Sequence, residues 1–281
     1  MKNRITKILG SEFPIIQGAM RRISLGELAA AVSRAGGFGI IGASGMEGNA
    51  LRAEVRKARS LTDRPFGLNI PIYRPNAFEA LEIAVEEGVK TITTSAGDPG
   101  KVILRVKEAG LRILHVVATV EMARKAEGAG VDAVIAVGAE GGGHVGRDEI
   151  STLVLIPQVV DAVRIPVVAA GGIGDGRGLV AAFALGAEGV QMGTRFLATQ
   201  QSPVPSSYKQ AILKAKDDGT MIAARKGYPI RVLKNRPPWP FGKWMREEPL
   251  RRRSTSLWTV FPIKEKVERG KGSCRQGRLR D

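Results

Sequence analysis

The chain has 281 residues, of which 43% are hydrophobic, and a formal net charge of +16. This length allows one large domain or two small ones, and the apolar content is that of a globular protein rather than a disordered one. No apolar run approaches the roughly 20 residues that span a bilayer, and the amino-terminal segment lacks the apolar core of a signal peptide. The one cysteine, Cys274, allows no internal disulfide, so we expect a cytoplasmic protein that does not act at a membrane.

The positive charge is unevenly distributed along the chain. Residues 236–281 contain 13 Lys and Arg against 5 Asp and Glu, whereas residues 1–235 contain 30 against 22, so each part carries +8. All three tryptophans and Cys274 lie in the last part, which has no sustained apolar period. We therefore predict a folded domain over residues 1–235 and an atypical basic tail over residues 236–281. The body of the chain is only mildly basic, which does not favour nucleic acid as a partner.

Short β-rich apolar runs recur along the body of the chain and alternate with helical patterns. Small and apolar residues at i, i+3 and i+4 predict helices, as in Ser24–Gly37, which opens at a candidate capping serine and ends in glycines. A last helix is predicted over Ser206–Asp217. The eight predicted strands are Pro14–Gly18, Phe38–Ala43, Pro65–Ile70, Thr91–Ala96, Arg112–Val117, Ala133–Gly138, Pro166–Gly172 and Gly189–Phe196.

Eight strands that alternate with helices predict a (β/α)8 TIM barrel. The strand starts are mostly 21–27 residues apart, and this even spacing favours the barrel over a doubly wound open sheet. The exception is 33 residues between the sixth and seventh strands, where the chain reads AEGGGHVGRDE, Ala139–Glu149. Because the loops after the strands form the active site of a barrel, this segment lies where chemistry is expected.

His144 in this loop is our candidate general acid or base, since imidazole titrates near neutral pH. The alternative is a structural histidine that is hydrogen-bonded to a backbone carbonyl. The other histidine, His115, lies inside a predicted strand, and we expect it to be structural. Glu140 could orient a ligand hydroxyl or His144, or it could be a solvated carboxylate. Two histidines and one cysteine in the tail do not favour a zinc site, and we predict no metal.

Glycine-rich segments follow several of the predicted strands. Those at the seventh and eighth strands, Ala170–Gly176 and Met192–Phe196, lie where barrels commonly bind phosphate. Backbone N–H groups in such segments, with a helix amino terminus, favour an anion. We therefore predict a phosphate-bearing ligand, and tight turns that simply require glycine are the alternative.

The segments PIIQGAM, LTDRPFGLNI, EGGGHVG, PVVAAGGIGDGRG and GAEGVQMGTRF resemble the nitronate monooxygenase family, formerly called 2-nitropropane dioxygenase. The family includes enoyl-acyl-carrier-protein reductase II, and the resemblance covers residues 1 to about 235. It implies an FMN-binding barrel in which His144 takes the place of the family's catalytic histidine. The residues that it implies for FMN binding are Gly18, Ala19, Met20, Asn69, Gly142, Gly143, Ala170, Gly171, Gly172, Gln191, Gly193 and Thr194.

The resemblance leaves two activities open. DEISTLVLIP and MGTRFLAT are similar to the monooxygenase branch, which oxidises nitronates with O2 to carbonyl compounds and nitrite, and we favour this branch. TTSAGDPGK and PIRVLKN are similar to the enoyl reductase branch, which uses FMN and NADH to reduce an enoyl thioester. Arg21 and Arg22 follow QGAM, where related chains often have Ala-Trp or Gln-Trp, and Val116 stands where some monooxygenases have a lysine that contacts the flavin.

A different class of function also stays open, namely a non-catalytic barrel that binds a phosphate ligand, or a nucleic-acid binder that uses the basic tail. We expect a small-molecule substrate, and a homodimer is one option for the assembly. With suitable synonymous codons, FGKWMREEPL and KGSCRQG read one base earlier contain WEMDEGGAP and GFLQAGQ, which are similar to the carboxyl-terminal part of the family. On this hypothesis the residues after about Arg236 are translated out of frame, and their charge says nothing about a partner.

Overall fold

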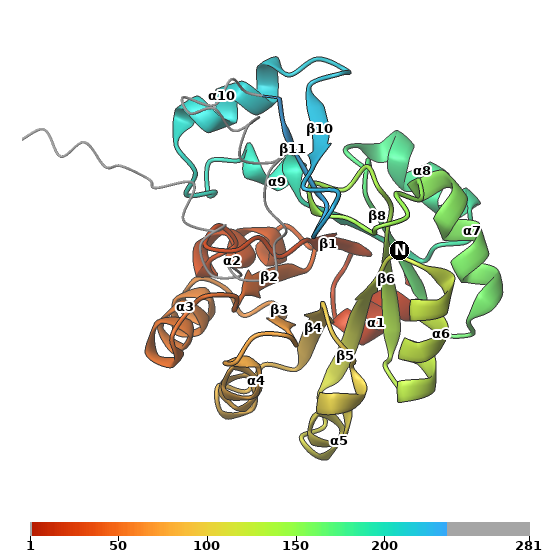
Figure 1. Cartoon of the computed structure of the whole chain (residues 1–281). Helices are drawn as coiled ribbons and strands as arrows, with labels where there is room; N and C mark the ends of the chain where they lie inside the picture. The colour runs from red at the N-terminus through yellow and green to blue at the C-terminus, as the bar shows by residue number, and fades with distance from the viewer. Residues whose placement is uncertain (1, 235–281) are drawn as a thin grey trace, which may run out of the picture. The chain divides into compact units, whose positions relative to one another are not determined.

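The computed structural model describes residues 2–234, and within them the eight predicted strands form one parallel sheet. The sheet closes because Phe38, the residue before β2, pairs with Ile16 of β1, and the amide of Gln17 donates to the carbonyl of Phe38 at 2.9 Å. This closed ring of strands confirms the predicted (β/α)8 barrel (Figure 1). In their order around the ring, the strands are β1 (Ile15–Gln17), β9 (Gly189–Met192), β8 (Val167–Ala170), β6 (Ala133–Val137), β5 (Arg112–Val117), β4 (Thr91–Ser95), β3 (Phe66–Pro71) and β2 (Gly39–Gly42).

Helices α2–α8 surround the strands, and each follows a strand of the barrel along the chain (Figure 1). The sequence pattern explains their limits. For example, the Thr119 hydroxyl accepts from the amide of Met122 at 3.1 Å and begins α6, which ends at Gly130 with φ 91°. The helices are α2 (Gly26–Arg34), α3 (Gly48–Leu61), α4 (Ala77–Glu86), α5 (Gly100–Glu108), α6 (Val120–Ala129), α7 (Thr152–Ala162) and α8 (Gly176–Ala184).

The predicted serine cap of α2 is wrong. The residue before this helix is Leu25, which makes no side-chain cap. The Ser24 hydroxyl instead accepts from the amide of Met20 at 2.8 Å. Ser24 therefore holds the loop after β1, which is part of the predicted site, rather than the start of a helix.

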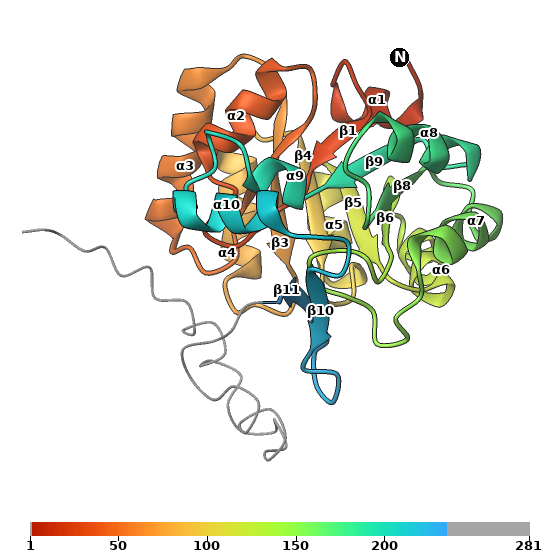
Figure 2. The same cartoon turned by 90° about the horizontal axis from the view of Figure 1, so that it is seen from above.

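The hydrophobic core has two layers. A larger cluster lies between the sheet and the helices, and a smaller one, which includes Ile16, Phe38 and Leu114, fills the barrel. Helix α1 (Arg4–Leu9) adds Ile5 and Leu9 to the inner cluster. Figure 2 shows α1 beside the start of β1, at the amino ends of the strands. The carboxyl ends of the strands are thus left for a site.

The eighth βα unit differs from the other seven. The predicted eighth strand was too long, because its end forms α9 (Thr194–Leu197), which has only four residues. The predicted last helix is confirmed as α10 (Ser206–Lys214), but none of its residues is buried. Helix α8 contacts β9, and a groove of about 430 Å³ lies between α2 and α8 beside β1 and β9. Ile15, Val32, Leu179, Val190 and Phe196 contribute to its lining.

A second, three-stranded sheet joins the hairpin that follows α10 to the segment that follows β6. It consists of β10 (Thr220–Ala223), β11 (Ile230–Leu233) and the two-residue strand β7 (Gly143–His144). Within residues 2–234 no helix is long and apolar enough to cross a membrane. The predicted tail, its cysteine and tryptophans, and the reading-frame hypothesis lie outside the described residues, so the boundary at residue 235 stays a prediction.

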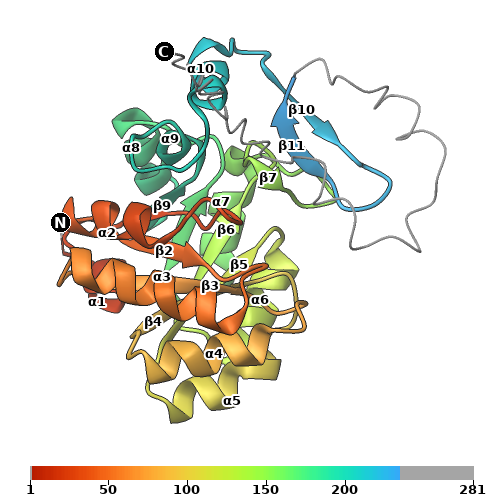
Figure 3. The ribbon, with the colours of Figure 1, turned by 90° about the vertical axis from the view of Figure 1, so that its left-hand side faces the viewer.

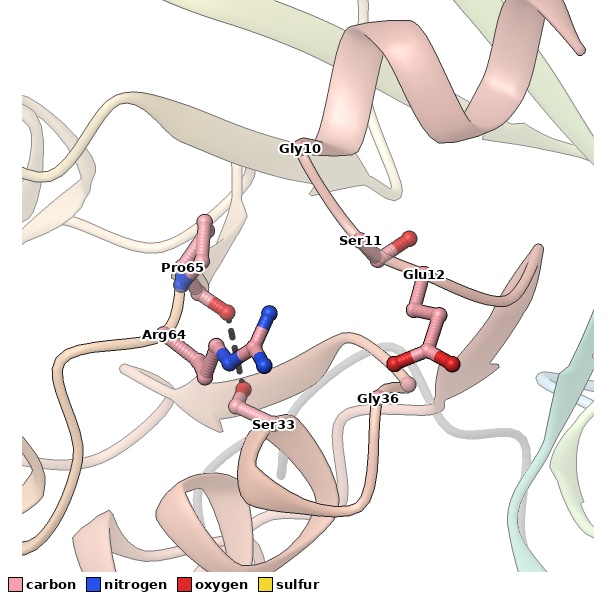
Figure 4. A pocket seen from close by; sticks show the side chains of 8 residues that line it. Gly10, Ser11, Glu12, Ser33, Gly36, Arg64 and Pro65 are labelled. Atoms are coloured by element: carbon pink, nitrogen blue, oxygen red, sulfur yellow. Dashed lines mark hydrogen bonds between the residues drawn. The ribbon is translucent and has the colours of Figure 1, made fainter. Parts of the chain in front are cut away.

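A small pocket lies at the amino ends of the first three strands (Figure 4). The Ser33 hydroxyl donates there to the carbonyl of Pro65 at 2.8 Å. The pocket measures about 10 Å³, which is near the smallest volume that admits a single water molecule. It is therefore too small for a substrate, and it lies at the opposite end of the barrel from the glycine-rich segments.

Candidate active site

The segments that follow β1, β9, β8 and β6 meet at the carboxyl end of the barrel, because these strands are neighbours in the sheet. A Cβ atom added at Gly193 would lie 3.9 Å from the Sδ atom of Met20, so the ends of β9 and β1 are in contact. One added at Gly142 would lie 3.4 Å from Oγ1 of Thr194. Residues from three separate glycine-rich segments thus lie on one rim.

The junction of β1 and β9 adds further predicted residues to this rim. The amide of Gly18 donates to the carbonyl of Met192 at 2.8 Å. A Cβ atom at Gly18 would lie 3.2 Å from Cγ of Gln191, which leaves no room for a larger residue without a shift. Ala19 packs against the inner hydrophobic cluster.

The turn after β8 requires glycine. Gly171 has φ 100° and Gly172 has φ 71°, which are backbone conformations that residues with a Cβ rarely adopt. A Cβ atom at Gly171 would also lie 2.9 Å from Oγ1 of Thr152 and 3.0 Å from the carbonyl oxygen of Gly138. The preceding residue, Ala170, is buried, and its carbonyl accepts from the amide of Gly138 at 3.0 Å. The backbone of the turn after β8 is therefore in close contact with the residues around it.

Three helices begin next to this rim, and they differ at their amino ends. The first amide of α7 donates to the carboxylate of Glu140 at 2.8 Å. Asp175 caps α8, because its carboxylate accepts from the amide of Arg177 at 2.9 Å. Helix α9 begins at Gly193, which has no side chain and provides no such cap. The amino end that is left for an anion is therefore that of α9, at Thr194.

Asn69 lies in β3, which is not one of the four strands above. Its side-chain amide donates to Oγ1 of Thr93 at 3.0 Å, and its carbonyl accepts from the amide of Ala43 at 3.0 Å. Asn69 is therefore held in position by its contacts with β4 and with the residue that follows β2.

His144 is held by a strand that the sequence analysis did not predict. It pairs with Ile230 of β11, and Gly143 pairs with Arg231 (Figure 3). The amide of Val145 donates to the carbonyl of Pro229 at 3.1 Å. The predicted loop around His144 is thus a short strand. The β-branched and apolar residues of PIRVLKN were the available signal, and they were interpreted only as a family likeness.

The side chain of Arg231 extends this attachment. Its Nε donates to the carbonyl of Ala139 at 2.7 Å, and its Nη1 donates to Oγ1 of Thr220 at 2.9 Å. Both ends of the segment from Ala139 to His144 are therefore tied to the β10–β11 hairpin.

The electrostatic surroundings of His144 favour its neutral form. Its imidazole is exposed at the mouth of the barrel, but neighbouring protein atoms replace part of its water. This partial desolvation and the positive charge of Arg74 both lower the pKa of His144. A neutral imidazole at pH 7 can accept a proton at one ring nitrogen and donate a hydrogen bond from the other.

The other two candidate side chains have structural contacts. Glu140 accepts from the amide and the hydroxyl of Thr152 at 2.8 and 2.9 Å, so it holds the loop against the start of α7. Both contacts are made by one carboxylate oxygen, Oε2, and the residue stays exposed. His115 is buried and lies 2.8 Å from Oγ1 of Thr94 through Nδ1, and burial lowers its pKa to about 4. These contacts are those of a structural histidine.

Comparison with known proteins identifies a family and several related sequences. The sequence model of a family described as nitronate monooxygenase matches residues 2–247. A Mycobacterium tuberculosis protein, (3aS,4S,5R,7aS)-5-hydroxy-7a-methyl-1-oxo-octahydro-1H-indene-4-carboxyl-CoA dehydrogenase, is 40% identical over 238 residues, which cover 83% of this chain and 66% of that protein. A probable nitronate monooxygenase of Staphylococcus saprophyticus is 36% identical, with 84% of this chain and 79% of that protein covered.

A solved structure shows the same fold. FabK from Thermotoga maritima superposes with a TM-score of 0.82 and 47% identity, over 87% of this chain and 77% of that chain. By contrast, the chain spans only about two thirds of the length of the dehydrogenases that it matches, 66% in each case.

Proposed function

Because the chain belongs to the nitronate monooxygenase family, we propose that it is an FMN-dependent nitronate monooxygenase. Its substrates would be alkyl nitronates, which it would oxidise with O2 to carbonyl compounds and nitrite. The observation that carries the proposal is the placement of His144 by β11 at the mouth of the barrel, with a pKa below its ordinary value.

The rim fits the phosphate and the edge of a flavin. The turn at Gly171 and Gly172 excludes a Cβ atom, and the amino end of α9 lacks a side-chain cap. A phosphate group at this place would accept from backbone N–H groups and lie at the positive end of a helix. The residues that would hold FMN are Gly18, Ala19, Met20, Asn69, Gly142, Gly143, Ala170, Gly171, Gly172, Gln191, Gly193 and Thr194.

FMN, when bound, supplies the transfer of electrons, and the chain supplies binding and proton transfer. With a neutral nitroalkane as substrate, the unprotonated ring nitrogen of neutral His144 would accept the proton from the carbon next to the nitro group. With a nitronate anion, this proton is already gone, and His144 would orient the nitro group by a hydrogen bond. The apolar residues inside the barrel close the opposite end of the site to water.

Replacing His144 with alanine tests this role. We expect a loss of turnover of roughly 10²- to 10⁴-fold with a neutral nitroalkane, because proton transfer by a positioned side chain contributes about that much. The loss with the matching nitronate should be smaller, and the flavin content should stay the same. Equal losses for both substrates would contradict proton transfer by His144, and the release of no FMN on denaturation of the wild-type protein would contradict the flavin.

A second candidate function is the reduction or oxidation of an acyl thioester, as in enoyl-acyl-carrier-protein reductase II with NADH. The observation that favours it is sequence identity. The chain is 47% identical to FabK and 40% identical to a carboxyl-CoA dehydrogenase, but 36% identical to the probable monooxygenase. The two candidates are separated by one anaerobic experiment. Rapid reduction of the bound flavin by NADH, reoxidation by crotonyl thioester and no nitrite from any nitronate would support the reductase and reject the monooxygenase.

A further inference from the structure

The first residue of α7 lies between the ends of two barrel strands. This residue is Thr152, which follows the segment that contains His144. A Cβ atom added at Gly138, the residue after β6, would overlap its Oγ1 atom, and one added at Gly171, the residue after β8, would lie 2.9 Å from the same oxygen. The hydroxyl group of Thr152 is thus enclosed by backbone atoms of both strand ends. The proposed reaction gives this hydroxyl no role.

The hydroxyl of Thr152 has three acceptors within reach. It lies 2.9 Å from Oε2 of Glu140, 3.0 Å from the carbonyl oxygen of Gly171 and 3.4 Å from that of Ala170. A hydroxyl group has one proton to donate, so these acceptors share it. The amide of Thr152 also donates to Oε2 of Glu140, at 2.8 Å. The two bonds to one carboxylate oxygen hold the side chain of Thr152 with its hydroxyl against the turn after β8.

The contact with Gly171 sets the direction of the next backbone amide. The peptide bond between Gly171 and Gly172 is trans and planar, so its C=O and N–H groups point in opposite directions. Because the carbonyl of Gly171 faces Thr152 at the start of α7, the N–H group of Gly172 faces away from that helix. Gly172 is exposed, and within residues 2–234 no acceptor takes a hydrogen bond from its amide. This N–H group is therefore directed and available to a ligand.

The backbone of this turn does not fix that direction by itself. Neither glycine has a side chain, so the peptide unit between them can adopt other orientations at little cost. The hydrogen bond from Thr152 to the carbonyl of Gly171 selects one of these orientations. Glu140 packs against the same turn, since a Cβ atom added at Gly172 would lie 3.1 Å from its Cβ. The loop after β6 thus supports the turn after β8 through two side chains.

We propose that Thr152 is a positioning residue for the phosphate group of the flavin, because it holds the carbonyl of Gly171 and so directs the amide of Gly172 toward the phosphate. The inference rests on the proposed function in that the ligand is FMN. Thr152 itself contacts neither the phosphate nor the substrate, and Glu140 keeps it in place. A phosphate that accepts from the Gly172 amide polarises the shared peptide unit and makes the Gly171 carbonyl a better acceptor. The bonds on the two sides of this peptide unit therefore strengthen each other.

The direct test compares two ligands that differ only in the phosphate. FMN and riboflavin are titrated separately into the flavin-free full-length protein, and flavin fluorescence measures each dissociation constant. Thr152→Val removes the hydroxyl at nearly the same volume and should bind FMN about tenfold more weakly, the size expected for one hydrogen bond. Its affinity for riboflavin should equal that of the wild type. Thr152→Ser keeps the hydroxyl and should retain most of the affinity for FMN.

The matched control is Thr119→Val, which removes the hydroxyl that caps α6 without touching the turn after β8. It should leave the affinities for both ligands unchanged. Thr152→Ala removes the hydroxyl without placing a methyl group against the carbonyl of Gly171, so it should weaken FMN binding as the valine variant does. Equal affinity for FMN in the wild type and in both hydroxyl-free variants of Thr152 would overturn the proposal. Equal losses for FMN and riboflavin would also overturn it, because they would show general support of the site.

A second measurement separates this proposal from the proposed function. Inorganic phosphate is titrated into the flavin-free protein, and the amide resonance of Gly172 is followed by NMR. The resonance should shift in the wild type and in Thr152→Ser, and much less in Thr152→Ala. A wild type that shows this shift but binds no FMN would keep the role of Thr152 and reject the flavin. A wild type that binds FMN without any shift of the Gly172 amide would overturn the proposal and keep the flavin.

Discussion

Replacing Arg231 with methionine should detach the His144 segment from the hairpin while the barrel stays folded. Arg231 donates to the carbonyl of Ala139 at 2.7 Å and to Thr220 at 2.9 Å, and the first of these bonds is partly buried. Hydrogen bonds from a charged donor contribute roughly 1.5–3 kcal/mol when buried and less when exposed. We take about 2 kcal/mol for the pair, which corresponds to about a 30-fold shift toward the unpaired segment. Methionine keeps most of the length of the side chain, so lost packing contributes little.

Hydrogen exchange at the amide of Val145 measures this shift, because that amide donates to the carbonyl of Pro229 across the same pairing. Its protection should fall by about 30-fold in Arg231→Met, since 1.4 kcal/mol is a factor of ten in an equilibrium constant. The amide of Val190, which donates to Pro14 within the barrel, should keep its protection. Turnover should fall with the protection of Val145, if the imidazole reacts only from the paired position.

Two control variants test this interpretation. Arg225→Gln removes an exposed ion pair with Glu149 in the same hairpin and should change little, because exposed pairs contribute little. Arg231→Lys keeps the charge and should restore part of the protection. If the amide of Val145 exchanges equally fast in the wild type and in Arg231→Met, the hairpin does not hold His144 and the reasoning fails.

Three further predictions concern the rim and the histidines. Gly171→Ala should lose bound flavin, because its Cβ would contact Thr152 and Gly138 at a φ of 100°. Gly174→Ala is the control, since its Cβ would meet open space, and it should keep the flavin. The flavin absorbance of the purified variants measures the difference. With a neutral nitroalkane, kcat/KM should rise with pH, and the midpoint of the rise should lie below about 6.5. The reason is that the lowered pKa of His144 keeps its basic form present at lower pH. A midpoint above that value would contradict the environment described for His144. The pKa of His115 is about 4 in the folded chain and about 6.5 in the unfolded chain, so the unfolded state binds more protons between these values. Stability should therefore fall by roughly 3 kcal/mol as the pH drops from 6.5 to 4, a loss that urea unfolding of His115→Gln should not show.

The barrel could be predicted because its signals are local. Most strands are short, largely buried apolar runs, and the intervening helices have their own apolar spacing, so neighbouring residues alone indicate the element. Even spacing then indicated the closed arrangement. Local signals failed where a contact competed with them, as at Ser24, whose hydroxyl bonds to Met20 instead of capping α2.

The arrangement of the site depends on contacts between distant parts of the chain. From the residue order it was already clear that His144 follows the sixth barrel strand and that glycines follow the seventh. Folding paired His144 with Ile230 and placed the carboxylate of Glu140 against Thr152. The bond from Arg231 to Ala139 joins residues 92 positions apart, and no local pattern specifies such a partner. Closing the barrel sets which loops become neighbours, and this closure decides the electrostatic surroundings of the one imidazole at its mouth.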